Sequence, residues 1–221
     1  MSTQAVSFLT PEQYLEIERK AERKSEYWNG EMFAMTGGTE PHNLVASNTA
    51  SLAHAQLRSK PCRVYHSDMR IRVLTTGLDT YPDIVIVCGE RLFLDGNRDT
   101  LLNPKVIVEV LSPSTEAYDR GRKFEHYRQI ESLEQYLLLS QDRMQAELFS
   151  RQPSGQWLLA FAAHPEEFVD LSSVGCKLSL AECYEKVDFP LNSGVPGAAS
   201  DNAGSATDLP ITNTPPRTAA T

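Results

Sequence analysis

The sequence has no apolar run long enough to cross a membrane, which takes about 20 residues. Met1–Thr10 also lacks the basic start and the apolar stretch of a secretory signal. Positive charge is scarce as well, because 21 Lys and Arg stand against 29 Asp and Glu, a formal net charge of −8. Proteins that hold nucleic acid through their bulk charge are basic, so any DNA contact requires a local basic surface. We expect a cytoplasmic protein that does not bind membranes.

Cysteine is also rare, and no pair has the Cys-x-x-Cys spacing of a zinc or redox motif. The four cysteines are Cys62, Cys88, Cys176 and Cys183. In a cytoplasmic protein, scattered cysteines are expected to be reduced, buried thiols. The histidines other than His42 show no metal-ligand spacing with cysteine or with one another.

The rest of the composition is that of a soluble globular protein, with 41% hydrophobic and 23% charged residues in a chain of 221. This length allows one sizeable core. Residues 191–221 are Gly, Ala, Ser, Thr, Asn and Pro with almost no large apolar side chain, so they cannot offset the entropy cost of ordering. We predict one folded domain over 1–190 and a disordered tail over 191–221.

The order of predicted elements indicates an α/β protein with a mixed sheet. Thr10-Pro11-Glu12-Gln13 is a capping box that opens a helix to about residue 22. Asn29-Gly30 between two apolar runs predicts a tight hairpin. The elements predicted after it are a helix over 40–59, strands over 62–73, 80–88 and 104–112, a helix over 117–131, a strand over 135–140, a hairpin over 144–163, and a short helix over 180–187.

One strand of this series carries an anomaly. Val106–Leu111 is a continuous apolar run, typical of a strand buried on both faces, except for Glu109. A buried carboxylate is costly unless it is paired, protonated or bound to a cation. The preceding strand has a similar acid at its entrance, Asp83 after Pro82. Two acids on neighbouring buried strands with a lysine nearby favour a metal-dependent phosphodiesterase. The competing interpretation is a turn cap for Asp83 and a buried ion pair for Glu109.

Four stretches resemble a known family. They are Tyr27-Trp28-Asn29-Gly30-Glu31, Tyr81-Pro82-Asp83-Ile84-Val85-Ile86, Val108-Glu109-Val110-Leu111-Ser112-Pro113-Ser114-Thr115, and Lys123 with Tyr127. Together they resemble the PD-(D/E)xK nuclease superfamily, and more closely its putative restriction endonuclease branch, often called the Uma-two family, over about residues 10–187. This resemblance implies a restriction-endonuclease-like core, to which the N-terminal helix and hairpin and the C-terminal antiparallel hairpin are additions. It also implies divalent-metal-dependent cleavage of DNA, and a homodimer.

Particular residues have expected roles, which follow from the resemblance for the acids and from position on the predicted helices for His42 and the arginines. Asp83 and Glu109 would bind Mg²⁺, or Mn²⁺ as a substitute, together with the backbone carbonyl of Val110. Glu31 would complete the metal shell or position water. His42, at the start of a helix, would contact a phosphate. Two arginines of the basic helix would also contact DNA, namely Arg120 and Arg122.

The sequence departs from the superfamily pattern two residues after Glu109, where the usual lysine is replaced by Leu111. Lys105 lies on the same strand face but about 13 Å away along the strand. Lys123, in the following helix, is the better candidate to orient the attacking water and stabilise the transition state. The competing interpretation of Lys123 is a solvated residue on a helix face.

Three functions therefore remain open at this stage. The first is a Mg²⁺-dependent DNA endonuclease. The second is a binding or partner-interaction module on the same fold, with cleavage lost because Leu111 replaced the lysine. The third is a structural protein whose buried acids only form ion pairs, which predicts no metal binding. Cation-dependent nicking of plasmid DNA distinguishes the first from the others.

Overall fold

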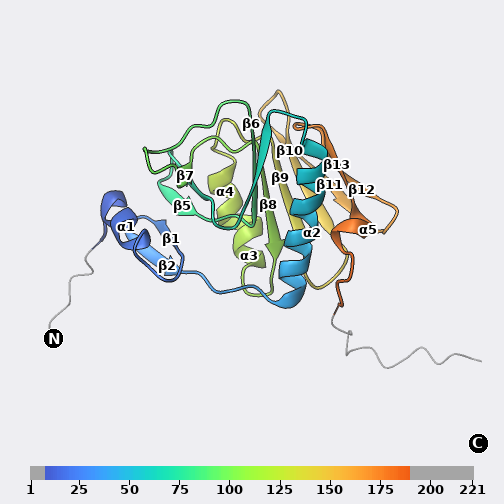
Figure 1. Cartoon of the computed structure of the whole chain (residues 1–221), viewed down its shortest axis with the longest axis horizontal. Helices are drawn as coiled ribbons and strands as arrows, with labels where there is room; N and C mark the ends of the chain where they lie inside the picture. Colours follow the sequence, from blue (N-terminus) through green and yellow to red (C-terminus); the bar gives the residue numbers. More distant parts are fainter. Residues whose placement is uncertain (1–7, 190–221) are drawn as a thin grey trace, which may run out of the picture. The chain divides into compact units, whose positions relative to one another are not determined.

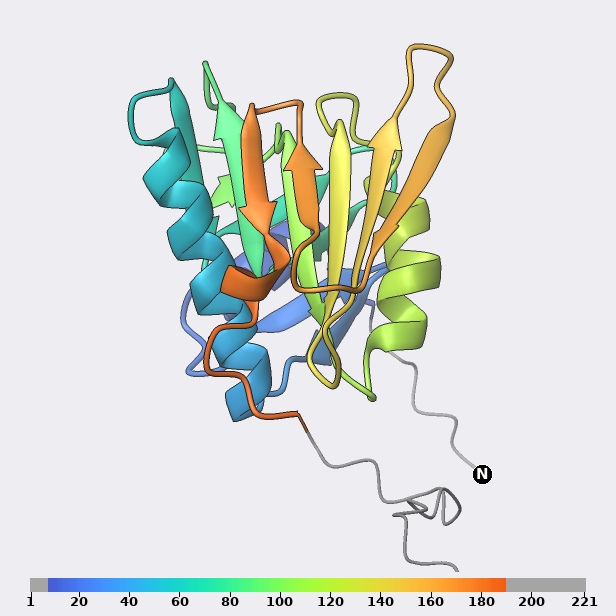
Figure 2. The same ribbon diagram turned by 90° about the vertical axis from the view of Figure 1, so that its right-hand side faces the viewer.

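The computed structural model describes residues 8–189 of the chain. These residues belong to one compact unit, and the predicted tail over 191–221 lies outside them. Within 8–189, no helix combines the length and the apolar character needed to span a bilayer. Figures 1 and 2 show two views of the fold, related by a quarter turn.

The N-terminal predictions are confirmed, except that the first helix ends at Glu18 rather than at about residue 22. Helix α1 (Pro11–Glu18) begins at Thr10, whose side chain and that of Gln13 form the reciprocal capping box. Strands β1 (Ser25–Trp28) and β2 (Glu31–Ala34) form the predicted antiparallel hairpin. Its turn residues both adopt positive φ, 50° for Asn29 and 89° for Gly30, which few side chains other than Asn and Gly tolerate.

A six-stranded mixed sheet is central to the fold, in the order β11-β10-β9-β8-β6-β3. Its β8–β9 pair is parallel and its other pairs are antiparallel. An apolar core on one face lies under α2, β12, β13 and α5. The bounds of these elements are β3 (Cys62–His66), β6 (Ile84–Cys88), β8 (Val106–Leu111), β9 (Gln135–Ser140), β10 (Ala146–Arg151), β11 (Trp157–Ala162), α2 (Glu40–Leu57), β12 (Phe168–Leu171), β13 (Cys176–Ser179) and α5 (Leu180–Cys183).

The second core lies on the opposite face of this sheet. It packs Ile107 and Leu111 of β8 against a five-stranded sheet of order β2-β1-β5-β4-β7 and against Tyr127 of helix α4. Side chains alternate along a strand, so Glu109 points to this same face. The remaining elements are β4 (Arg70–Val73), β5 (Leu78–Thr80), β7 (Thr100–Leu101), α3 (Glu116–Tyr118), the π-helical turn η1 (Asp119–Lys123) and α4 (Phe124–Tyr127).

Two predicted strands are each divided between the two sheets, which corrects the sequence prediction. The stretch 62–73 turns after His66, where the Met69 N–H donates to the His66 carbonyl, so β3 and β4 enter different sheets. The stretch 80–88 breaks at Tyr81–Asp83 between β5 and β6. Pro82 has no N–H for a ladder, which favours a break there. This break places Asp83 at the entrance of β6.

The helical region after β8 also differs from its prediction. It ends at Tyr127 rather than at residue 131, and a π-helical turn interrupts it at Asp119–Lys123. Such turns widen a helix locally and are frequent at functional sites. Strands β12 and β13 were not predicted, whereas β9 has the predicted bounds and the predicted β10–β11 hairpin is confirmed.

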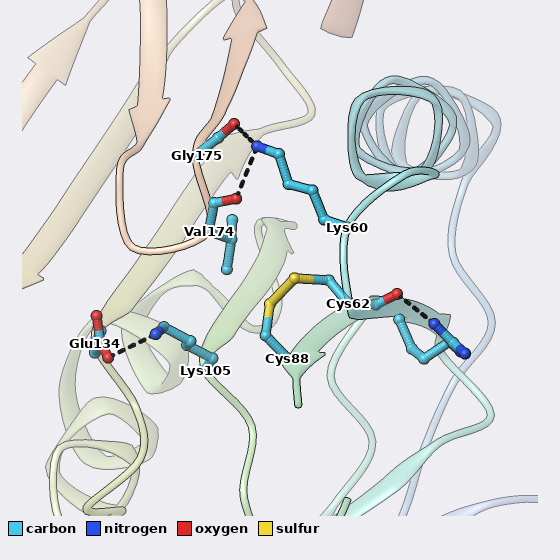
Figure 3. The surroundings of a disulfide bond; sticks show 8 residues. Lys60, Cys62, Cys88, Lys105, Glu134, Val174 and Gly175 are labelled. Carbon is cyan, nitrogen blue, oxygen red and sulfur yellow. Dashed lines mark hydrogen bonds and ion pairs between the residues drawn. A yellow bond between two sulfur atoms is a disulfide. The ribbon is translucent and has the colours of Figure 1, made fainter. Parts of the chain in front are cut away.

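The prediction of reduced thiols is wrong for two of the four cysteines. Cys62 and Cys88 lie directly opposite each other in the antiparallel β3–β6 pair and form a disulfide (Figure 3). They are separated by 26 residues in the chain, so only the register of the strands brings them together. Cys176 and Cys183 are free and buried, as expected.

We expect reduction of this disulfide to destabilise the protein. In the chain-entropy model, releasing a loop of this length costs about 3.5 kcal/mol of unfolding free energy. Denaturant unfolding with and without reductant measures the difference, and Cys88→Ser is the control that should not respond to reductant. Thiol titration of the unreduced, denatured protein should find two free thiols, whereas finding all four cysteines free would contradict the bond.

Candidate active site

The strand pairing itself brings Asp83 and Glu109 together. Strands β6 and β8 are antiparallel with Ile84 opposite Val108, so the residue before β6 lies beside Glu109. Oε2 of Glu109 accepts a hydrogen bond from the Asp83 backbone N–H at 3.3 Å. Oδ2 of Asp83 in turn accepts one from the Val110 N–H at 2.7 Å. Backbone donors therefore fix both carboxylates at one end of the sheet, where β6 begins and β8 ends.

Glu109 is deeply buried, with 4% of its surface exposed. Burial raises the pKa of its carboxyl to about 8. The negative charges of Asp119 and Asp83 raise this pKa further, and the ammonium of Lys123 lowers it but does not cancel the effect of burial. Its Oε1 accepts a hydrogen bond from the Tyr127 hydroxyl at 2.8 Å. The carboxylate is thus held at both oxygens, with Oε2 on the side of Asp83.

Lys123 lies on the other side of Glu109. Its Nζ is 2.9 Å from Glu109 Oε1, 3.2 Å from Glu26 Oε1 and 3.3 Å from Asp119 Oδ1. The residue is 5% exposed, which excludes the solvated helix-face interpretation. Burial lowers the pKa of Lys123, but the surrounding carboxylates outweigh it and hold this pKa well above its usual value. The site therefore contains a fixed ammonium in contact with Glu109.

Glu26 and Asp119 were not identified from the sequence. Glu26 lies on β1, and its Oε1 also accepts a hydrogen bond from the Thr80 hydroxyl. Glu31, the acid proposed from the resemblance, is exposed on β2 opposite Trp28 and is not among the residues that line the pocket described below. The hairpin sequence contains both acids, and only the pairing of β1 with β5 through Tyr27 and Asp79 shows which one turns inward.

The remaining candidates divide into one that reaches the site and two that do not. Nε2 of His42 is 3.3 Å from Asp83 Oδ2. Arg120 pairs with Glu116 at 2.9 Å and with Glu147. The Arg122 guanidinium lies over the Trp28 ring, 5.0 Å from its centroid. Neither arginine is among the residues that line the pocket, so the structure brings neither to Asp83 and Glu109.

The acids, Lys123 and His42 line one pocket of about 1090 Å³. Its walls come from the start of α2, the loop after β8 and the segment between α1 and β1, where Arg23 and Lys24 add positive charge. Both views show the start of α2, the end of β8 and α3 at the same end of the six-stranded sheet (Figures 1 and 2). A ligand in this pocket would contact Asp83 and Glu109 at the end of the sheet where β6 begins and β8 ends.

The donor set fits a hard divalent cation. Within residues 8–189, no three His, Cys, Asp or Glu side chains form a ready cage for a metal ion. A cage is not required, because Mg²⁺ keeps several waters and is commonly bound by one or two carboxylates. Asp83 and Glu109 supply two carboxylates, and Val110, whose carbonyl is a third oxygen donor, lines the same pocket.

Comparison with known structures identifies the class of fold. A crystal structure of a putative nuclease belonging to DUF820, from Anabaena variabilis, matches with a TM-score of 0.66 at 18% identity. The match covers 80% of this chain and 97% of that chain. The chain therefore has a restriction-endonuclease-like α/β fold, as the sequence predicted.

Sequence comparison identifies the family. The family model Uma2, described as a putative restriction endonuclease, matches residues 11–181, and the chain belongs to this family. Two uncharacterized proteins of Synechocystis sp. are similar to it. One is 33% identical over 182 residues, covering 82% of this chain and 94% of the relative. The other is 32% identical over 159 residues, covering 72% and 90%. The family description points to a nuclease, and the structural match shows the fold.

Proposed function

We propose that this protein is a divalent-metal-dependent endonuclease that hydrolyses phosphodiester bonds in DNA, with Mg²⁺ as cofactor and Mn²⁺ as a substitute. The observation that carries the proposal is the position of Glu109. One of its oxygens lies beside Asp83 at the pocket, and the other contacts the ammonium of Lys123. A single carboxylate thus links a candidate cation site to a fixed positive charge.

Asp83, Glu109 and the Val110 carbonyl would hold the cation. When bound, the cation would activate water and offset the charge of the scissile phosphate. The protein's own contribution is to fix these donors on two paired strands, so that little reorganisation is needed when the substrate arrives.

Lys123 would supply the positive charge that the superfamily usually places two residues after the second acid. Its ammonium can orient a water molecule and stabilise the charge that develops on the phosphate. Glu26 and Asp119 keep Lys123 protonated and position it, since both lie within 3.3 Å of Nζ. Lys123 is the last residue of the π-helical turn, a feature that is frequent at functional sites.

DNA would approach through the pocket mouth, where Arg23 and Lys24 supply basic side chains, the second of them also paired with the exposed Asp68. Backbone phosphates would be the groups they contact. Arg120 and Arg122 are less suited to this role, because Glu116 and Glu147 hold the first and Trp28 covers the second. The homodimer and the cytoplasmic location stay predictions.

Nicking of supercoiled plasmid tests the proposal. We expect the purified protein to convert supercoiled DNA to the open circle with Mg²⁺ or Mn²⁺ and to be inactive after chelation. Wild-type protein that binds Mn²⁺ but cuts none of a panel of duplex, single-stranded and branched DNA would instead indicate a binding module. If the protein binds no divalent cation, the buried acids only form ion pairs and the protein is not a metal-dependent nuclease.

A further inference from the structure

His42 lies where the candidate metal donors converge. Its Nε2 is 3.3 Å from Asp83 Oδ2, and it lines the same pocket as Glu109 and Val110. One of the proposed oxygen donors is therefore in contact with this ring nitrogen, and the other two line the pocket that it faces. Neighbouring ligands of an octahedral cation with bonds near 2.1 Å are about 3 Å apart, so the observed separation is compatible with both atoms binding one ion.

The ring is held in this position by the loop before α2. Asn43 donates to the carbonyls of Gly38 and Thr39 at 3.0 and 2.8 Å, and the Thr39 hydroxyl donates to Gln141 at 3.1 Å. A Cβ on Gly38 would be 2.6 Å from His42 Nδ1, so only glycine leaves room for the imidazole there. The side chain is 16% exposed, and its Nδ1 has no partner among the described residues. Nε2 is thus the nitrogen directed at the site.

We infer that His42 is a ligand of the divalent cation, together with Asp83, Glu109 and the Val110 carbonyl. This inference rests on the proposed function and replaces the phosphate contact expected from the sequence. An imidazole among oxygen donors favours Mn²⁺ over Mg²⁺, because Mg²⁺ prefers oxygen while transition metals accept imidazole nitrogen well. His42 therefore sets the cation preference of the site.

The test is electron spin-echo spectroscopy of bound Mn²⁺, with calorimetric affinities for Mn²⁺ and Mg²⁺. Wild-type protein should show the hyperfine modulation of a directly bound nitrogen, and His42→Ala should abolish it. Loss of the ligand should weaken Mn²⁺ binding by about tenfold or more and Mg²⁺ binding by less. His54→Ala is the matched control, since His54 is exposed farther along the same helix and should leave the spectrum unchanged.

A pair of glycine variants tests the same point with His42 present. Gly38→Ala forces the imidazole away and should reduce the nitrogen signal and the Mn²⁺ affinity. Gly37→Ala should change neither, because its Cβ would meet nothing within 4 Å.

The outcomes separate this inference from the proposed function. Mn²⁺ bound without nitrogen modulation, or modulation that persists in His42→Ala, overturns the role of His42 and leaves the metal site standing. If the wild-type Mn²⁺ spectrum shows no nitrogen and His42→Ala loses DNA binding, His42 would be a phosphate contact and not a metal ligand. Wild-type protein that binds no Mn²⁺ would refute the proposed function itself.

Discussion

Lys123→Ala is expected to reduce plasmid cleavage by roughly a hundredfold or more, which is typical for an electrostatic group at a reacting centre. Binding of Mn²⁺ should persist, because Lys123 faces Oε1 of Glu109 and Asp83 lies on the side of Oε2. The variant also removes the ammonium that pairs with the buried carboxylates of Glu109 and Asp119, so we expect a loss of about 3–5 kcal/mol in unfolding free energy. Rates should be measured well below the melting temperature of each variant.

Two further variants make this prediction specific. Lys105→Ala is the control, since Lys105 precedes the same strand but pairs with Glu134 at 3.0 Å, away from the pocket. Leu111→Lys in the Lys123→Ala background should recover part of the activity, because residue 111 is about 6–7 Å along the same strand face from Glu109. Recovery should be incomplete, since Leu111 is 3% exposed in the second core. A Lys123→Ala enzyme that nicks plasmid at the wild-type rate would contradict this role.

Asp83→Asn and Glu109→Gln should each abolish Mn²⁺ binding and cleavage while preserving the fold. Each change removes one of two carboxylates that would bind the ion. The metal-free Asp83→Asn variant should be at least as stable as the wild type, because it removes the negative charge beside Glu109. Glu109→Gln relieves the same repulsion but also removes a charged partner of the buried Lys123, so its unfolding free energy should be lower than that of Asp83→Asn. Calorimetry for Mn²⁺ and thermal unfolding measure the two effects.

Asp68→Asn is the matched control for both variants. Asp68 lines the same pocket, but its side chain is 92% exposed and pairs with Lys24 at 3.0 Å. It should therefore retain Mn²⁺ binding and cleavage. If Asp83→Asn bound Mn²⁺ as tightly as Asp68→Asn does, the ion would be held elsewhere.

The sequence predicted best what depends on local chemistry. The capping box at Thr10, the Asn29-Gly30 turn and the apolar strand 135–140 are each specified within a few residues, and each was found. The mixed sheet followed from the order of such elements. Asp83 and Glu109 were recognisable because a carboxylate in an apolar strand or at its entrance is unusual, and the structure places the two side by side.

The errors concern contacts between distant segments. The disulfide between Cys62 and Cys88 depends on the β3–β6 register, and the inward position of Glu26 depends on the β1–β5 pair. The strands predicted over 62–73 and 80–88 were too long because each stretch joins two sheets, and periodicity alone does not mark the crossing. The contact of Lys123 with Glu109 likewise joins distant segments, and the π-helical turn that contains Lys123 has no simple sequence signal.

The central claim is that Asp83 and Glu109 bind a divalent cation at the end of the central sheet where β6 begins and β8 ends. Crystals soaked in Mn²⁺ and measured for anomalous scattering test it most directly. The account predicts one strong anomalous peak in the wild type, bound by a carboxylate oxygen of each acid and by the Val110 carbonyl, and no peak in Asp83→Asn. A wild-type map with no anomalous density between Asp83 and Glu109, at a Mn²⁺ concentration that supports cleavage in solution, would contradict it.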